Sequence, residues 1–437
     1  MEESASDPDG DPSPRRRFLS SLGAVTVAVL AGCSSDKSTG TDTPDEATPT
    51  GVGSDDRADG TDSDATPTEV DTGSGATPTE DGPQNGANTS DVRWPSFCQN
   101  LSNTGYNTAL SGPAGPVTVE WSFTTGARVR SPPTVDNDRG YFGSWDGHMY
   151  AVDRTDGTEQ WSVLLRGRID VAPAVAHDTV YVGSYDDTVR ALDATDGSEK
   201  WRYETGNQVL SSPAVTDDTV YVGSHDGILY ALGQADGRER WSFETDDHVR
   251  SSPAVADDTV YVGSNDGNIY AIDRETGRQR WTFETDARVS CSPAVADRTV
   301  YVGSYDTNVY AIDTADGTEQ WSFPTDGGVF SSPAVADETV YVGGNDTTVY
   351  ALDRRDGSKQ WRFDAAGEMK PSPAVTDDTV YIGSLDDLVY ALDRADGTEL
   401  WRFETGNIVD SSPAVVDGMV YIGSHDATMY ALAHDTS

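Results

Sequence analysis

Aspartate recurs at every fortieth position over much of this chain. Because carboxylates bind metal ions, a metal site is the first possibility to test. Calcium takes about six to eight oxygen ligands that converge on one point. These aspartates instead stand one per repeat in a hairpin turn, where a carboxylate accepts hydrogen bonds from nearby backbone. We therefore interpret them as turn caps and predict no metal site. The aspartates are Asp146, Asp186, Asp226, Asp266, Asp306, Asp346, Asp386 and Asp426.

Nucleophiles and thiols offer no catalytic constellation either. The chain has no Ser-His-Asp order and no histidine spacing typical of a metal enzyme, so no catalytic residue is predicted. Its three cysteines, Cys33, Cys98 and Cys291, are too few for a disulfide framework or a four-thiolate metal site. A single bridge between Cys98 and Cys291 stays open.

Basic and aromatic residues are the remaining candidates, because they occupy loop positions that vary from repeat to repeat. Basic groups beside aromatic rings suit an anionic ligand or an acidic peptide. Drift at solvated positions is an equal alternative. Replacing Arg128, Arg130 and Arg250 together by serine is expected to weaken partner capture without changing stability. The candidate ligand mouth comprises Arg128, Arg130, Trp145, Arg168, Tyr185, Arg250, Arg288, Tyr305 and Lys370.

A repeat of forty residues must position these loops. In the unit 201–240, short β-rich runs begin at Trp201, Ser211, Thr219 and Ile228, and Asp-Gly or Asp-Asp turns separate them. Four strands per repeat is typical of a propeller blade. Eight units therefore predict an all-β, eight-bladed propeller. The repeats are marked by Trp121, Trp161, Trp201, Trp241, Trp281, Trp321, Trp361 and Trp401.

The two ends of the array predict how the ring closes. The array begins with a lone strand over 117–125, and the last unit stops at Leu432 with no tryptophan strand after it. The N-terminal strand can therefore complete the last blade as its outermost member. This arrangement protects an edge that would otherwise be open to aggregation.

The segment 151–161 reads A-x-D-x3-G-x3-W, which resembles the tryptophan-docking motif of the pyrroloquinoline-quinone (PQQ)-like propeller repeat family. The motif recurs in most units, although Gly233 replaces the aspartate before Trp241. Residues 94–97 and 104–106 are similar to the leader of those propellers. The resemblance implies that each indole packs against the glycine turn of the next blade. The eight tryptophans are then structural rather than part of a cofactor site.

The N-terminal residues 1–33 have the pattern of an export signal. Arg15, Arg16, Phe18 and Leu19 precede an apolar run that is too short to span a bilayer and that ends in L-A-G-C at Cys33. The pattern resembles a twin-arginine signal peptide followed by a lipobox. It implies lipidation of Cys33 and an anchor on the outer face of the cell membrane.

The chain then divides into a stalk and a folded part. Residues 34–91 are rich in Thr, Asp, Pro and Gly and almost free of large apolar side chains, which predicts a disordered stalk. The propeller is expected over 92–437, with a leader over 92–116 and the repeats from 117.

The charge of the chain excludes one class of partner. A formal net charge of -44 repels phosphate backbones, so nucleic acid is not expected. The excess of Asp over Glu and of Arg over Lys resembles the proteins of salt-loving archaea, in which concentrated salt screens such repulsion.

Two functions from different classes fit such a propeller. The first is a monomeric, non-catalytic binding or assembly scaffold for an envelope protein, a peptide or an anionic surface polymer, with no cofactor. It resembles the propeller lipoprotein of the outer-membrane β-barrel assembly machine. The second is a quinoprotein dehydrogenase that uses PQQ and calcium. The adjacent cysteines and pocket-walling inserts of those enzymes are missing here, so binding is favoured.

Overall fold

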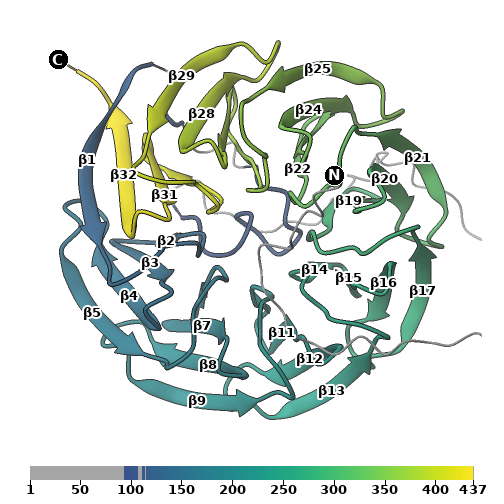
Figure 1. Ribbon diagram of the computed structural model, residues 1–437. Helices are drawn as coiled ribbons and strands as arrows, with labels where there is room; N and C mark the ends of the chain where they lie inside the picture. Colours follow the sequence, from purple (N-terminus) through teal and green to yellow (C-terminus); the bar gives the residue numbers. More distant parts are fainter. Residues whose placement is uncertain (1–92, 107–110, 114, 437) are drawn as a thin grey trace, which may run out of the picture. The chain divides into compact units, whose positions relative to one another are not determined.

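The computed structural model of the protein describes residues 93–106, 111–113 and 115–436. In this part of the chain, 32 strands form eight four-stranded antiparallel sheets, arranged as blades around a centre (Figure 1). The predicted all-β, eight-bladed propeller is thereby confirmed. The expected signal residues Arg15, Arg16, Phe18, Leu19 and Cys33 and the stalk over 34–91 lie outside the described residues.

Each blade runs from an innermost to an outermost strand. The innermost strands are β2 (Thr134–Asp136), β6 (Ala174–Ala176), β10 (Ala214–Val215), β14 (Ala254–Ala256), β18 (Ala294–Ala296), β22 (Ala334–Ala336), β26 (Ala374–Val375) and β30 (Ala414–Val416). The second strands are β3 (Arg139–Gly143), β7 (Thr179–Ser184), β11 (Thr219–Gly223), β15 (Thr259–Gly263), β19 (Thr299–Gly303), β23 (Thr339–Gly343), β27 (Thr379–Gly383) and β31 (Met419–Gly423).

The third strands are β4 (His148–Asp153), β8 (Thr188–Asp193), β12 (Ile228–Gly233), β16 (Asn268–Asp273), β20 (Asn308–Asp313), β24 (Thr348–Asp353), β28 (Leu388–Asp393) and β32 (Thr428–His434). The outermost strands are β5 (Glu159–Leu164), β9 (Glu199–Glu204), β13 (Glu239–Glu244), β17 (Gln279–Glu284), β21 (Glu319–Pro324), β25 (Lys359–Asp364), β29 (Glu399–Glu404) and β1 (Val117–Thr124).

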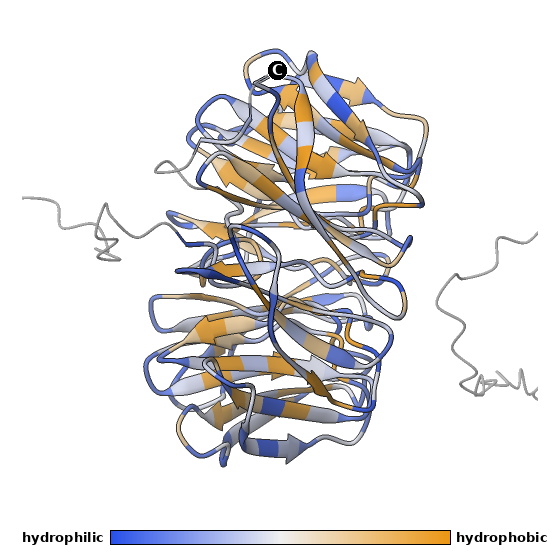
Figure 2. Cartoon of the chain, turned by 90° about the vertical axis from the view of Figure 1, so that its left-hand side faces the viewer, coloured by the Kyte–Doolittle hydropathy of each residue, from blue (hydrophilic) through white to orange (hydrophobic). Residues whose placement is uncertain are grey.

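Burial along the strands follows their place in the blade. The second strand β15 is buried at every residue, because blades cover both of its faces, and its sequence T-V-Y-V-G is nearly continuous in apolar and β-branched residues. The outermost strand β17 buries its tryptophan and exposes most of its other residues. Seen from the side, apolar residues follow the strands while polar residues collect in the loops (Figure 2).

The innermost strands are shorter than the sequence pattern predicts. A run from Ser211 to Val215 is expected as strand, but β10 covers Ala214–Val215. Pro213 has no N–H to offer a ladder, and the Ser211 hydroxyl accepts the N–H of Gly223 at 3.1 Å. Side-chain hydrogen bonds therefore replace the ladder near the channel.

Tryptophan joints connect neighbouring blades around the ring. The indole N–H of Trp281 donates to the Thr314 carbonyl of the next blade at 2.8 Å. Gly317, at a φ of 75°, lies so close that a Cβ there would stand 2.8 Å from the indole. The indoles of Trp121, Trp161, Trp201, Trp241, Trp321 and Trp361 likewise donate to the carbonyl 33 residues further on.

The ring closes as predicted and with one addition. Strand β1 pairs antiparallel with β32, which makes it the outermost strand of the last blade. No hairpin connects these two strands, so Trp401 has no ordinary turn to meet. Its indole N–H instead donates to the carbonyl of Pro113 in the leader, at 2.6 Å. The leader thus supplies the missing half of the closing joint.

The aspartates at forty-residue spacing hold turns. The carboxylate of Asp266 accepts the N–H of Asn268 at 2.9 Å and the hydroxyl of Tyr270 at 2.8 Å, and it also accepts the N–H of Asp246 from the neighbouring loop at 3.1 Å. Within the described ranges, no group of three or more His, Cys, Asp or Glu side chains is arranged to hold a metal ion.

Cys98 and Cys291 are both buried and both carry free thiols, so the bridge that the sequence left open does not form. Cys291 takes a place that serine holds in several other blades, and its Sγ accepts the N–H of Gly303 at 3.1 Å. Burial raises the pKa of the Cys291 thiol to about 12. The residue is therefore an inert part of the core.

Candidate functional site

The residue nine positions after each tryptophan points to the centre of the ring in all eight blades. Together they line one cavity of about 110 Å³, which we call the throat. The antiparallel strand order brings the loop before each innermost strand beside the hairpin between the second and third strands, so both form the mouth above the throat. The eight residues are Arg130, Asp170, Leu210, Arg250, Ser290, Phe330, Lys370 and Asp410.

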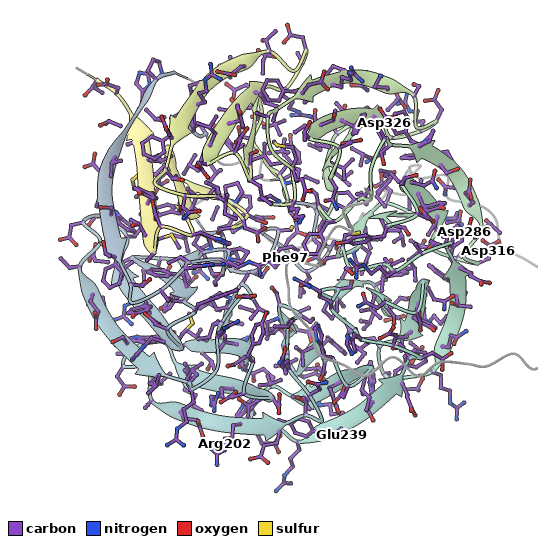
Figure 3. All side chains as sticks on the ribbon, in the orientation of Figure 1. Phe97, Arg202, Glu239, Asp286, Asp316 and Asp326 are labelled. Carbon is purple, nitrogen blue, oxygen red and sulfur yellow. The ribbon has the colours of Figure 1, made fainter. Side chains whose placement is uncertain are left out.

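The leader closes the end of the throat opposite the mouth. Successive leader carbonyls accept backbone N–H groups from the innermost strands: Pro95 from Val175 at 2.8 Å, and Leu101 from Val255 at 2.7 Å. Phe97 lines the throat from below and lies at the ring centre (Figure 3). The throat is therefore a blind pocket open toward the mouth, which repeat analysis alone did not reveal.

Three arginines surround one indole on the rim of the mouth. The guanidinium carbons lie 4.3 Å (Arg168), 5.0 Å (Arg128) and 5.7 Å (Arg130) from the ring centre of Trp145. Distances under about 6 Å are those of cation–π contacts. Arg128 and Arg168 are exposed, so their donors face solvent above the ring. We call these four residues the Trp145 cluster.

Arg130 differs from the other two arginines, because it bridges two carboxylates of the throat. Its guanidinium lies 2.6 Å from Asp410 and 3.3 Å from Asp170. Asp170 also accepts hydrogen bonds from the Tyr185 hydroxyl, at 2.9 Å, and from the Trp145 indole. Replacing Arg130 would leave both carboxylates facing each other. From this bridge we expect a serine substitution at Arg130 to lower stability, in contrast to the sequence-based expectation for the triple substitution.

Two titrating groups beside the Trp145 cluster have shifted pKa values. Burial lowers the pKa of His425 to about 4, and the charges of Arg130 and Arg128 act in the same direction. Its Nε2 is buried without a hydrogen bond. Burial and the neighbouring Asp170 raise the pKa of Tyr185. Both groups are thus held neutral near pH 7.

The remaining predicted mouth residues form separate pairs rather than one cluster. The Arg250 guanidinium lies 5.0 Å from the Phe330 ring centre, and that of Arg288 lies 4.0 Å from Tyr305. The Lys370 ammonium pairs with Glu368 at 2.8 Å. The mouth therefore carries the Trp145 cluster in one sector and separate cation–aromatic and ion pairs in others.

A serine collar, which sequence analysis did not single out, lines the throat below the variable residues. In the collar, the backbone N–H of each blade donates to the serine hydroxyl of the next: Ser212 to Ser252 at 3.0 Å, and Ser252 to Ser292 at 2.9 Å. By the same forty-residue spacing, Pro132 and Ala172 occupy the two places without a hydroxyl. The forty-residue spacing of these serines is the sequence signal from which the collar could have been predicted. The collar comprises Ser212, Ser252, Ser292, Ser332, Ser372 and Ser412.

Fold and site together define a PQQ-type propeller with a blind, polar throat. The sequence model of the family described as outer membrane protein assembly factor BamB matches residues 104–174, 167–288, 265–373 and 345–437. The chain therefore belongs to this family. No curated protein matches the sequence.

Solved structures share the fold at low sequence identity. BamB from Moraxella catarrhalis is 21% identical, with a TM-score of 0.64 over 74% of this chain and 99% of that one. A europium-containing methanol dehydrogenase is 14% identical, with a TM-score of 0.68 over 78% and 98%. Quinohemoprotein alcohol dehydrogenase from Comamonas testosteroni is 15% identical, with a TM-score of 0.68 over 79% and 81%. At such identities, the likeness is one of fold.

Among the residues that the structure describes, none belongs to a helix long and apolar enough to cross a membrane.

Proposed function

We propose that this protein is a non-catalytic, extracytoplasmic scaffold that binds an acidic envelope protein, an acidic peptide or an anionic surface polymer at the mouth of its propeller. The Trp145 cluster carries the proposal. Three guanidinium groups gather on one indole in a chain whose formal net charge is -44. Arginine and tryptophan are also the residues that most often dominate binding energy at protein interfaces.

The charge around the mouth supports the same conclusion. The positions seven and nine residues after each tryptophan hold six Arg or Lys and three Asp or Glu among sixteen residues, against 30 basic and 74 acidic residues in the whole chain. Such a local reversal attracts acidic partners and raises their association rate. The description of the family as an assembly factor agrees with a scaffold.

A lipid anchor at Cys33, as the L-A-G-C motif predicts, would tether the propeller to the outer face of the cell membrane. Charged residues on outermost strands such as β9 disfavour edge pairing between copies, which supports a monomer.

The alternative, a PQQ-dependent dehydrogenase with calcium, fits the throat poorly. Pockets for ligands of that size occupy roughly 300 Å³ or more, whereas the throat measures about 110 Å³. Its two aspartates, Asp170 and Asp410, are both bridged by Arg130 rather than converging on a cation position. We therefore propose that the protein works without quinone. A native mass spectrum of the lipidated protein that showed stoichiometric quinone and calcium would overturn this.

The decisive experiment compares two triple variants with equal charge change. Arg128, Arg168 and Arg288 are replaced by serine in one, and the outer-strand residues Arg202, Arg362 and Arg402 in the other. The probe is a fluorescein-labelled peptide of ten aspartates, followed by anisotropy at fixed ionic strength. We expect the mouth variant to bind at least tenfold more weakly, because charge-assisted hydrogen bonds are lost. The outer variant should change by less than about twofold.

The outcomes separate mouth binding from general electrostatics. Equal losses in both variants would show that the peptide responds to overall charge. Unchanged binding in both variants would mean that the mouth arginines do not contribute to binding and vary by neutral drift. Alginate, tested in the same way, distinguishes an anionic polymer from a peptide as the preferred partner.

A further inference from the structure

We propose that a pocket between two neighbouring blades binds one neutral sugar residue. The pocket measures about 390 Å³ and lies between the blade of β10 to β13 and the blade of β14 to β17, which are adjacent in the ring (Figure 1). We call it the seam pocket. Its turns lie at the opposite end of the antiparallel strands from the mouth hairpins, so the site is separate from the throat and does not rest on the function proposed for the mouth.

The central observation is that Arg274, which lines the seam pocket, lacks the aspartate that its counterparts bind. In three other blades, the arginine after the third strand pairs with an aspartate in the innermost turn of the preceding blade, as Arg354 does with Asp297 at 2.6 Å. The other two pairs are Arg154 with Asp417 and Arg394 with Asp337. No described residue forms an ion pair or a hydrogen bond with the guanidinium of Arg274. Its donors can therefore serve a ligand.

A different turn in the preceding blade explains why Arg274 has no such partner. By the spacing of the other pairs, its aspartate would be Asp217. Asp297 has a φ of 51°, in the left-handed region, whereas Asp217 does not. Thr216, which replaces the alanine found before Asp297, fixes another turn, because its hydroxyl accepts a backbone N–H of that turn at 3.2 Å. The Asp217 carboxylate is fully exposed and lies 3.7 Å from His177 instead.

The lining of the seam pocket carries both signs of charge in nearly equal number, with four carboxylates and three guanidinium groups. Two of the guanidinium groups are already bound by carboxylates. These pairs are Arg240 with Asp218 and Arg280 with Asp273, both at 2.7 Å. Asp258 and Glu275 are exposed, and neither forms an ion pair with a described residue. One guanidinium and two carboxylates therefore remain for a ligand.

This balance of charge favours a neutral ligand that can both donate and accept hydrogen bonds. The carboxylates repel an anion, and the guanidinium groups repel a cation. A hydroxyl group suits both, because it donates to a carboxylate and accepts from a guanidinium. A ligand with several hydroxyl groups can therefore contact Arg274, Asp258 and Glu275 at the same time.

Size and an aromatic ring narrow the ligand to a sugar. About 390 Å³ lies within the range of pockets for small organic ligands, roughly 300 to 1,000 Å³. Trp241 lines the seam pocket and is the one repeat tryptophan that is not fully buried. Its indole offers an apolar surface to the C–H groups of a sugar ring, while the charged side chains meet the hydroxyls. Such a sugar occurs free or linked in a glycan.

Saturation-transfer NMR with the full chain tests the proposal. The probes are glucose, galactose, mannose and N-acetylglucosamine, each also as its methyl glycoside. We expect at least one to bind with a Kd of roughly 1 mM, and crystals soaked in it should show the ring against Trp241 and Arg274. Binding of a free sugar without its methyl glycoside would assign the site to free sugars, and binding of both to a glycan. Water alone in the seam pocket, with no NMR signal, would overturn the proposal.

Charged analogues test the balance of charge in the lining. Glucuronate adds a carboxylate to the glucose ring, and glucosamine adds an ammonium group. We expect both to bind more weakly than the best neutral sugar. Tighter binding of either analogue would show that one sign of charge dominates the seam pocket, and the assignment to a neutral sugar would be wrong.

Matched arginine variants test the role of Arg274. Arg274→Gln should weaken sugar binding about tenfold, because hydrogen bonds to a charged group are lost. Arg354→Gln is the control, since Arg354 has the same place in its own blade but is bound to Asp297 and does not line the seam pocket. It should leave sugar binding unchanged. Equal weakening in both variants would make the effect structural and contradict a site at Arg274.

Thr216→Ala tests the same site through its turn. It gives this turn the sequence A-D-D-T-V of residues 256–260, in which Asp257 has a φ of 50°. We expect Asp217 to adopt that conformation and to pair with Arg274, so that sugar binding weakens about tenfold. A crystal structure shows the pair, and the NMR titration measures the binding. A formed pair with undiminished sugar binding would overturn the role of Arg274, and an unchanged turn would refute the role of Thr216.

Discussion

The outer tryptophan joints and the throat share one forty-residue period but use it in opposite ways. At the joints, the same contact recurs with indole to carbonyl distances of 2.8 to 3.0 Å from Trp121 to Trp361. In the throat, the eight equivalent positions carry cations, anions, a serine, a leucine and a phenylalanine. Residues that repeat hold blades together, while residues that differ create one unsymmetrical surface.

The difference teaches where stability and binding reside in a ring of equal units. The joints require the same residues in each blade, because every blade must meet its neighbour with the same geometry. A binding surface at the axis requires different residues, because identical ones would form a symmetrical ring that suits few partners. The throat nevertheless carries one structural element, the bridge of Arg130 between Asp170 and Asp410.

The largest effect is expected from deleting residues 117–125, which removes β1 from the last blade. Strand β1 provides the ladder to β32 and buries Trp121 in the joint with the first blade. We expect the thermal unfolding midpoint to fall by roughly 10 °C or more. Circular dichroism measures it, and removal of nine residues from 34–42 is the control. An unchanged midpoint would refute closure by this strand.

Trp281→Ala tests a regular joint. Loss of this buried indole should lower the free energy of unfolding by about 3 to 5 kcal/mol, because it leaves a cavity against Gly317. Trp241→Ala should cost less, since Trp241 is only half-buried. Denaturant titrations measure both. Equal costs would show that the joints do not depend on how deeply the indole is buried.

Arg130→Met tests whether the throat is purely a binding surface. The substitution leaves Asp170 and Asp410 without their shared cation, so we expect a loss of about 3 kcal/mol. Replacing both aspartates by asparagine in the same chain should restore most of the loss. A stable single variant would mean that the bridge contributes little and that the throat is free to vary.

His425 yields the smallest effect, and it depends on pH. Its pKa is about 4 in the folded protein, against 6.5 for an unperturbed histidine. Below pH 6.5, the unfolded chain binds a proton that the folded protein excludes, so stability falls as the pH drops toward 4. At pH 5 the loss attributable to His425 is about 2 kcal/mol. His425→Asn should remove this part of the pH dependence, and an unchanged profile would contradict it.

Sequence patterns predicted the shared parts of the molecule well. Period and turn signals were enough for the eight blades and for the role of β1, because local turn chemistry and alternation act within one repeat. They failed at the innermost strands, where Pro213 has no N–H for the ladder and the Ser211 hydroxyl accepts the Gly223 N–H instead. They also missed Pro113, since a leader residue that caps the closing joint carries no repeat signal.

The candidate site was predictable only as a set of residues. Positions nine after each tryptophan were identifiable by counting, and all eight line the throat. Counting could not predict which of these residues interact with one another. The gathering of Arg128, Arg130 and Arg168 on Trp145 depends on side-chain directions across two blades. Such directions have no signature in a linear pattern.

The sequence by itself therefore determined the fold class, the number of blades and the identity of the variable loop residues, because each follows from a local period. Only the tertiary structure decided that the throat is blind and that Arg130 is bound between two aspartates. These facts depend on the closure of the ring. The closed ring brings together residues far apart in the sequence. Ser212 and Ser252 are 40 positions apart, and Ser411 and Ser131 are 280 positions apart.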